Sequence, residues 1–594
     1  MKAKLNNSTL QELYKFSSDG QCLFIQKWSE LFFYKTINTY QFKLRNSHTI
    51  LKETKSVLDL MKSHSISPAN LKDLIQECKK HLEKDLSFKK HYRDLLDTLI
   101  KNLKLKSTDK NDLLQLEYRL NNALRFITNT YKKNLISDLE TAISQNEFEE
   151  IEHFTDLLAS ELVNQGWSPA SLNRLLQIYF TSAKCLEKTF EERWENFIKE
   201  INKNEGYFHC YFKIDETDHH FIDNLKASDL KVVSGEELLK TFININTHVQ
   251  KESFYLEERV EAHYEDMRSA VEKSRYQLAI KQSILSYFGT YLEDFSKVLV
   301  IFPDENKIVD FELRSENNLE VEPIDDDIHL VVSLLKDETL LEEDRQRLLN
   351  FFRQYDLSIK AFSIETKYSN LWSSIESLLV TGHHESLIDH IKKIIPSIMC
   401  SNYVQRLLYN FLEDCYRAGL RPLFNAELID KGKQDCLINL FKLFTEDENK
   451  LEDFINSLDD YTLLKQRCIE ISKSLSDSKT LRDLMTNHFN TLTWHIQRLY
   501  RVRNNLVHAA TAEKDITLLI EHLHFYIRST IHELVSKIQN KEFNSLGNLY
   551  LAIEDNYYAL IEILMKNISD SPKKGPINRY ESDLIFEGPI FIYE

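Results

Sequence analysis

Apolar residues recur at spacings of three and four along most of the chain, which is the period of an amphipathic helix. The stretch "NLKDLIQECKKHLEKDL" shows this period, and "KNDLLQLEYRLNNALRFITNTYKKNLISDLETAISQ" sustains it over a greater length. Two helices are expected to begin at "SPANLKDLI" and "SPASLNRLL", because serine favours the N-cap and proline the first helical position. The pattern therefore predicts a helical N-terminal region over residues 1–205.

The pattern changes between residues 206 and 365. "GYFHCYFKI" is aromatic and alternating, which is typical of a strand, and "LKVVSGEELLKTF" predicts a short strand, a Ser-Gly turn and a helix. The next stretch, "SFYLEERVEAHYEDMRSAVEKSRYQLAIKQSILSYF", predicts one long helix, and "SKVLVIFPDENKIVDFELR" predicts two strands joined by a turn. With "HLVVSLL", a helix near "LLEEDRQRLLNFFRQ" and "LSIKAFSIE", these segments predict a small mixed α/β region.

Helical periodicity resumes at "YSNLWSSIESLLV" and predicts a helical domain over residues 366–540, followed by a C-terminal helix and tail over 541–594. The apolar end of the tail is suited to adding a strand to the body or to a partner. Glycine and proline, which punctuate turns, number only 11 and 9 in 594 residues. We therefore expect a mainly α protein with a small mixed α/β insert and a helical bundle near its C-terminus.

Charge and cysteine usage narrow the class of protein. The formal net charge of −17 argues against a general nucleic-acid coat, so any nucleic-acid site must be a local basic cluster. No two of the eight cysteines have the CxxC spacing of a zinc or redox motif, and no signal peptide is visible. Because no run of about eighteen apolar residues occurs, we expect no membrane span. The expectation is a cytoplasmic protein with reduced, mostly buried thiols.

Motifs for cofactors and metals are missing. The chain has no Walker-type or Rossmann glycine loop and no HExxH spacing. "TDHHF" and "TGHHES" contain paired histidines, but neither pair has companion ligands at helical spacing, so surface histidines are expected. We therefore expect neither a cofactor nor a metal, and a nucleotide-hydrolysing motor or a metalloenzyme is disfavoured.

The stretch "RVRNNLVHAA", residues 501–510, belongs to a predicted helix with an unusual charge pattern. Apolar residues at helical spacing predict its buried stripe: Leu492, Ile496, Leu499, Val502 and Leu506. Arg498, Arg501 and Arg503 lie on the same helix, and no acidic residue occurs between Asn490 and Ala512. This run predicts a compact positive patch that binds a phosphate backbone, with Arg498 and Arg501 as substrate-binding residues.

Helical geometry relates the polar residues of this stretch. At about 100° per residue, Asn504 and His508 nearly share a face, whereas Arg503 lies about 140° from His508. A second copy of the helix, related by a two-fold axis, would bring its own Arg/His pair across and so complete one cleft. The alternative is structural: Arg503 pairs with a nearby acid and His508 caps or packs.

An Arg/His pair suits the chemistry of RNA cleavage. RNA carries its own nucleophile, the 2′-hydroxyl, and an imidazole near neutral pKa can move the proton. A guanidinium can stabilise the charge that develops on the phosphorane oxygens, so no metal is required, and Asn504 can orient the phosphate or the imidazole. DNA lacks the 2′-hydroxyl and should be spared.

The segment "RNNLVH", from Arg503 to His508, resembles the signature of HEPN domains, in which arginine and a polar residue precede a histidine. "YSNLWSSIESLLV" resembles the first helix of the Apea-like HEPN branch, with Glu376 as its acidic residue before Leu378 and Leu379. The resemblance covers about residues 365–540. It implies a helical domain that dimerises and acts as a metal-independent endoribonuclease. It also implies that Arg503 and His508 are catalytic, that Asn504 supports them, and that Glu376 holds the arginine.

HEPN proteins with large additional domains are similar to bacterial effectors of phage defence and toxin systems. The resemblance thus implies that a phage or host trigger is recognised by the region before the HEPN-like domain, with residues 206–365 as a candidate sensor, and releases cleavage of RNA. Two other functions stay open. The first is a catalytically inert HEPN module that dimerises or binds RNA as an adaptor for a partner protein. The second is a helical adaptor whose acidic surface recruits a basic partner.

Overall fold

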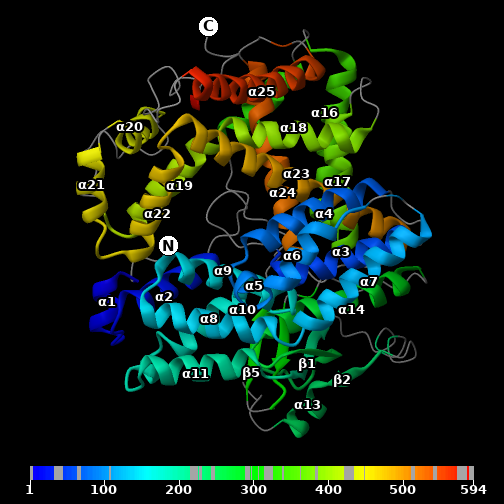
Figure 1. The fold of residues 1–594 in the computed structure, drawn as a ribbon. Helices are drawn as coiled ribbons and strands as arrows, with labels where there is room; N and C mark the ends of the chain where they lie inside the picture. The colour runs from blue at the N-terminus through cyan, green and yellow to red at the C-terminus, as the bar shows by residue number, and fades with distance from the viewer. Residues whose placement is uncertain are drawn as a thin grey trace. The chain divides into compact units, whose positions relative to one another are not determined.

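The computed structural model describes residues 5–32, 45–62, 68–214, 230–242, 248–287, 297–313, 325–380, 386–420, 434–539 and 545–570, apart from short gaps within these ranges, and a few further residues such as 585 and 586. Helices make up most of the described chain and accompany a five-stranded antiparallel sheet (Figure 1). The predicted mainly α class with a small mixed insert is confirmed. No described helix is both long and apolar enough to cross a bilayer.

The chain divides into two compact units. Unit 1 contains residues 1–161, 323–356 and 368–594, and unit 2 contains residues 162–322 and 357–367. These units do not follow the predicted domains. The first 161 residues fold together with the helices after residue 368, and the predicted boundary at residue 205 falls inside unit 2.

Unit 1 consists of helices, three of which, over residues 148–164, 342–360 and 364–379, extend past its bounds. Those from the first part of the chain are α1 (Asn7–Glu12), α2 (Asp19–Leu31), α3 (Ser47–Lys62), α4 (Pro68–Lys84), α5 (Leu86–His91), α6 (Arg93–Asn102), α7 (Lys110–Ile127), α8 (Tyr131–Gln145) and α9 (Phe148–Asn164). Those from the later part are α15 (Asp325–Lys336), α16 (Glu342–Lys360), α17 (Ile364–Leu379), α18 (Leu387–Ser401), α19 (Tyr403–Arg417), α20 (Gln434–Thr445), α21 (Glu448–Asn456), α22 (Thr462–Ser474), α23 (Ser478–Ala509), α24 (Ile516–Gln539) and α25 (Leu546–Asp570).

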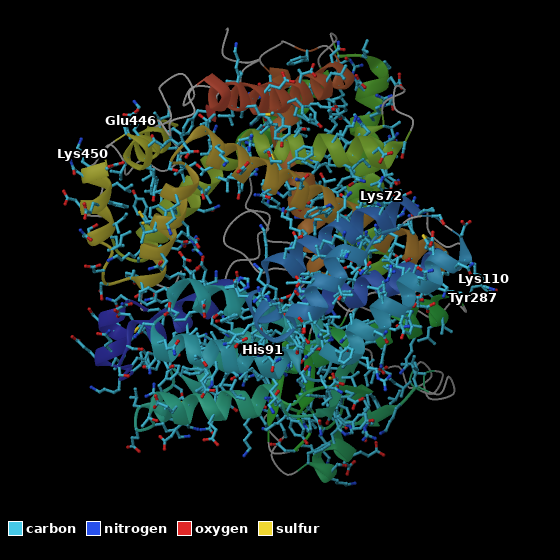
Figure 2. The ribbon with its side chains drawn as sticks, viewed as in Figure 1. Lys72, His91, Lys110, Tyr287, Glu446 and Lys450 are labelled. Atoms are coloured by element: carbon cyan, nitrogen blue, oxygen red, sulfur yellow. The ribbon has the colours of Figure 1, made fainter. Side chains whose placement is uncertain are left out.

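Sequence-distant helices pack against each other within unit 1. The buried Gln26 of α2 donates to the carbonyl of Leu5 at 2.8 Å and accepts from the backbone N–H of Leu463 on α22 at 2.9 Å. Helix α18 lies beside α25, and both contact α23 (Figure 1). Charged side chains cover the outer faces, as Lys110 on α7 and Lys450 on α21 show (Figure 2). The N-terminal helices are therefore part of the body that holds α23.

Unit 2 is built on the sheet, whose strand order is β2-β3-β1-β4-β5. Its elements are α10 (Pro169–Tyr179), η1 (Ala183–Cys185), α11 (Phe190–Ile201), β1 (Glu205–Ile214), β2 (Val232–Ser234), α13 (Gly235–Thr241), β3 (Phe254–His263), α14 (Met267–Tyr287), β4 (Lys297–Ile301) and β5 (Ile308–Glu312). Strand β1 pairs antiparallel with β3, with Phe208 opposite Val260. Apolar residues of α14 and of β1, β3 and β4 form one buried core between the helix and the sheet.

Three predictions in this region are confirmed: the strand at β1, the short strand and helix at β2 and α13, and the two strands joined by a turn at β4 and β5. The single long helix predicted from Ser253 is wrong, because its first part is strand β3 and only the part from Met267 is helical. The stretch "FYLEERVEAH" alternates in burial over its second half and pairs with β1, so sheet pairing outweighs its helix-forming residues. Asp266 then caps α14 through the backbone N–H of Ser269 at 2.9 Å.

The mixed region is also shorter than predicted. Its last strand ends at Glu312, "HLVVSLL" lies in α15, and "LSIKAFSIE" contributes to α16 and α17. In the tail, residues 585 and 586 are helical and buried, not extended, whereas the rest of the apolar end lies outside the described residues. The two histidine pairs lie outside them as well. Seven cysteines are described, and all seven are free and buried, as predicted.

Asp266 joins the starts of two helices in unit 2, so its loss should destabilise that unit. Its carboxylate accepts from the backbone N–H and the hydroxyl of Ser168 at 2.6 and 2.7 Å and is fully buried. We expect Asp266→Ala to cost about 3 kcal/mol, because a helix cap and buried hydrogen bonds are lost together. Hydrogen exchange of the α10 and α14 amides in urea would measure it.

Ser234→Ala is the matched control, because Ser234 caps α13 at an exposed position and its loss should cost about 1 kcal/mol. Equal effects of the two substitutions would contradict the role given to Asp266.

Candidate active site

Helix α23 carries all but one of the residues that the sequence predicts for the site. It runs for 32 residues, and the predicted apolar stripe is buried at Leu492, Ile496, Leu499 and Val502. Its backbone is described through Ala509, so Asn504 and His508 lie one turn apart on the same helix. The His508 side chain lies outside the described residues.

Arg498 and Arg501 point into unit 1, not toward solvent. Each residue is 3% exposed. The guanidinium of Arg498 pairs with Glu53 of α3 at 2.9 Å and with Glu77 of α4 at 2.8 Å, and that of Arg501 pairs with Glu53 at 2.5 Å. The prediction of an accessible positive patch is therefore wrong for two of its three arginines. Acids from distant helices pair with Arg498 and Arg501, so neither is placed to bind a substrate.

The charges of this buried network hold each other in their ionised forms. Burial by itself raises the pKa of Glu53, but the guanidiniums of Arg498, Arg45 and Arg501 outweigh it and hold that pKa well below its ordinary value. Burial likewise opposes the lowered pKa of Glu77, which Arg498 brings about. The network thus fixes α23 against α3 and α4 by charge-assisted hydrogen bonds.

The earlier histidines of α23 are unsuited to proton transfer at neutral pH. His495 is buried beside His522 of α24, with 3.3 Å between their ring nitrogens, and also contacts the Tyr526 hydroxyl at 3.1 Å. Burial, with the neighbouring His522 and Arg498, lowers the pKa of His495 far below its ordinary value, and burial lowers that of His522 to about 3. Burial also lowers the pKa of His488. His508 is the remaining histidine of this helix.

Arg503 makes a different set of contacts near the C-terminal end of α23. Its guanidinium Nη2 lies 3.5 Å from Glu376 Oε2 of α17, and its Nη1 lies 3.2 Å from Asn504 Oδ1. The side chains of Arg503 and Glu376 are 29% and 22% exposed. The structure thus brings together Arg503, Asn504 and Glu376 at a position that solvent reaches.

Glu376 has a further partner that the sequence did not suggest. The indole Nε1–H of Trp372, one turn earlier on α17, donates to Glu376 Oε1 at 2.7 Å. The carboxylate therefore uses one oxygen for the indole and the other for Arg503. In this arrangement the guanidinium of Arg503 and the amide N–H group of Asn504 can donate to a phosphate oxygen and stabilise charge that develops on it, while the carboxylate holds the guanidinium.

The described residues contain no group of three or more His, Cys, Asp or Glu side chains that could hold a metal ion. No protein-family model, curated protein or solved structure matches this chain.

Glu53 pairs with three guanidiniums, so its substitution should be costly. Arg45 pairs with Glu53 at 2.6 Å beside the two arginines of α23. We expect Glu53→Gln to destabilise unit 1 by about 3–5 kcal/mol, because buried cations lose their counter-charge. Urea unfolding followed by circular dichroism would measure the change. Glu117→Gln is the control: Glu117 bridges Lys55 and Lys62 at the surface, and its loss should cost under about 1 kcal/mol.

The same carboxylate should make stability fall in acid. Because the folded-state pKa of Glu53 is lowered, its contribution is complete above the ordinary value of 4.5 and is lost as the pH falls through the folded value. Urea midpoints measured from pH 7 to pH 3 should therefore decline more steeply below about pH 4.5 in the wild type than in Glu53→Gln. Parallel profiles for the two proteins would show that Glu53 is not held ionised by its neighbours.

Proposed function

We propose that this chain is a metal-independent endoribonuclease of the HEPN type, with Arg503 and His508 as its catalytic groups. The observation that carries the proposal is that Arg503, Asn504 and Glu376 meet where solvent reaches them, whereas the structural alternative requires only the ion pair of Arg503 with Glu376. The burial of Arg498 and Arg501 supports it, because it leaves Arg503 as the arginine of "RVRNNLVH" that solvent reaches. The pKa shifts of the other histidines of α23 support His508 as its proton carrier.

The reaction follows from the groups assigned to it. The 2′-oxygen of RNA attacks the adjacent phosphorus while an imidazole of His508 accepts its proton, and the bond from phosphorus to the 5′-oxygen breaks. A second imidazole supplies a proton to the leaving 5′-oxygen. Arg503 stabilises the charge on the phosphorane oxygens, Glu376 holds its guanidinium, and Asn504 orients the phosphate. The products are a 2′,3′-cyclic phosphate and a 5′-hydroxyl.

A homodimer would supply the two imidazoles. Arg503 and His508 lie about 140° apart around one helix, so a single copy turns them to different sides. Two copies around a two-fold axis would place an Arg/His pair from each on one linkage. Activity would then depend on the alignment of two copies of α23.

The wider role we propose is that of an effector in a bacterial anti-phage or toxin-like system. Glu53 of α3 and Glu77 of α4 bind Arg498 and Arg501 of α23. These two arginines precede Arg503 by five and two residues. A phage or host trigger acting on the N-terminal helices could thus reach the catalytic helix directly.

One observation favours an inert adaptor as the second candidate. Two of the three arginines of the predicted patch are neutralised internally, which reduces the positive surface that RNA would contact. A HEPN-like module that recruits a protein partner has no need of that surface. Cleavage assays separate the two functions.

Purified protein should degrade single-stranded RNA in EDTA and leave 2′,3′-cyclic phosphate ends, while DNA of the same sequence stays intact. Arg503→Ala and His508→Ala should each lower the rate by about 10²-fold or more, since each removes a group that acts in the transition state. Gel assays with end analysis would measure this. Arg482→Ala is the matched control, because Arg482 is a partly exposed, ion-paired arginine of the same helix.

A cell assay covers the case in which cleavage needs a trigger. Induced expression in bacteria, with and without phage infection, should arrest growth and fragment RNA for the wild type and for Arg482→Ala, but not for His508→Ala. Wild-type cleavage by either catalytic variant would reject the site. Intact RNA under every condition, with a co-purifying protein partner, would favour the adaptor.

A further inference from the structure

Trp372 is buried in unit 1, yet its indole nitrogen donates a hydrogen bond to a partly exposed residue of the site. The residue is fully buried, and its Nε1–H donates to Glu376 Oε1 at 2.7 Å. A buried indole N–H requires an acceptor, and packing alone would be satisfied by phenylalanine or leucine. The acceptor here is a carboxylate that also faces Arg503.

Glu376 needs such a partner if it is to hold Arg503 in one place. An ion pair of 3.5 Å between partly exposed groups is weak, because solvent screens it and both side chains lose rotamer freedom. The indole donor fixes one carboxylate oxygen, so the other is directed at the guanidinium before substrate arrives. Preorganised groups of this kind stabilise a transition state without reorganising.

Trp372 is itself held by the helix that carries Arg503. Its ring lies 5.7 Å from that of Tyr500 on α23, one turn before Arg503 and Asn504. The indole thus donates to the carboxylate on α17 and packs beside the ring of Tyr500 on α23. A shift of one helix along the other would break the alignment of Glu376 with Arg503.

We propose that Trp372 is a positioning residue for RNA cleavage: its indole N–H orients Glu376 so that the carboxylate holds the Arg503 guanidinium in its reactive place. This inference rests on the proposed endoribonuclease function. It adds a fully buried residue, which touches no substrate, to the groups that determine the rate.

Trp372→Phe keeps the ring and removes the donor. It should lower kcat by about tenfold and leave KM within about twofold, because the misplaced guanidinium stabilises the transition state less while substrate binding elsewhere is retained. Tyr368→Phe is the matched control. It removes the 2.7 Å hydrogen bond from the Tyr368 hydroxyl to the Leu499 carbonyl, a fully buried donor at the same α17–α23 contact that does not touch Glu376.

A double-mutant cycle separates positioning from stability. If Trp372 acts through Glu376, then Trp372→Phe should cost little further activity in a Glu376→Ala background. Additive losses, or equal losses in Trp372→Phe and Tyr368→Phe, would overturn the positioning role and leave the proposed function standing. A wild type that cleaves no RNA in the test tube or in cells would overturn both.

Fluorine NMR provides a readout that does not depend on activity. The chain has five tryptophans, so protein labelled with 5-fluorotryptophan should give few resonances, and the signal missing in Trp372→Phe identifies Trp372. Glu376→Ala should shift that resonance, because the indole loses its acceptor, whereas Tyr368→Phe should leave it in place. A Trp372 resonance unmoved by Glu376→Ala would overturn the hydrogen bond on which the inference depends.

Discussion

The burial of Arg498 and Arg501 against Glu53 and Glu77 is the constraint on which the rest of unit 1 depends. Charged groups leave water only at a large cost, which these contacts offset because their hydrogen bonds are short and shared. Removing one partner leaves a buried charge without its counter-charge. Few of these residues of α3, α4 and α23 can therefore be substituted one at a time. The network therefore sets where α23 lies relative to the N-terminal helices.

The middle of α23 and its C-terminal end differ in burial and charge pairing. In its middle part Arg498 and Arg501 are buried and ion-paired, and the buried His488 and His495 have strongly lowered pKa values. Near its C-terminal end Arg503 instead meets Glu376, a partly exposed carboxylate of α17. In the function we propose, the first part holds the helix in place and the last turns carry the reacting groups, as is typical of sites built on regular elements.

Local patterns predicted what local physics determines. The three- and four-residue period gave the helices, the Ser-Pro start gave α10, and the burial of Leu499 and Val502 followed from the apolar stripe. The pairing of Arg503 with an acid was one open alternative, and the HEPN resemblance named Glu376. The fate of Arg498 and Arg501 was not predictable, because their partners lie more than 400 residues earlier in the chain. For Glu77 the sequence contains a weak indication of burial, because the residue adjoins the apolar stripe of α4.

The central claim is that Arg503 and His508 act on a phosphate whose own ribose provides the nucleophile. It is tested most directly with two RNA oligonucleotides that differ only by a 2′-deoxy sugar on the 5′ side of one cleaved linkage. The account predicts cleavage of that linkage in the full RNA, none where the 2′-hydroxyl is missing, and unchanged cleavage at other linkages. Equal cleavage of both at that linkage would contradict it, because water or a protein group would then be the nucleophile.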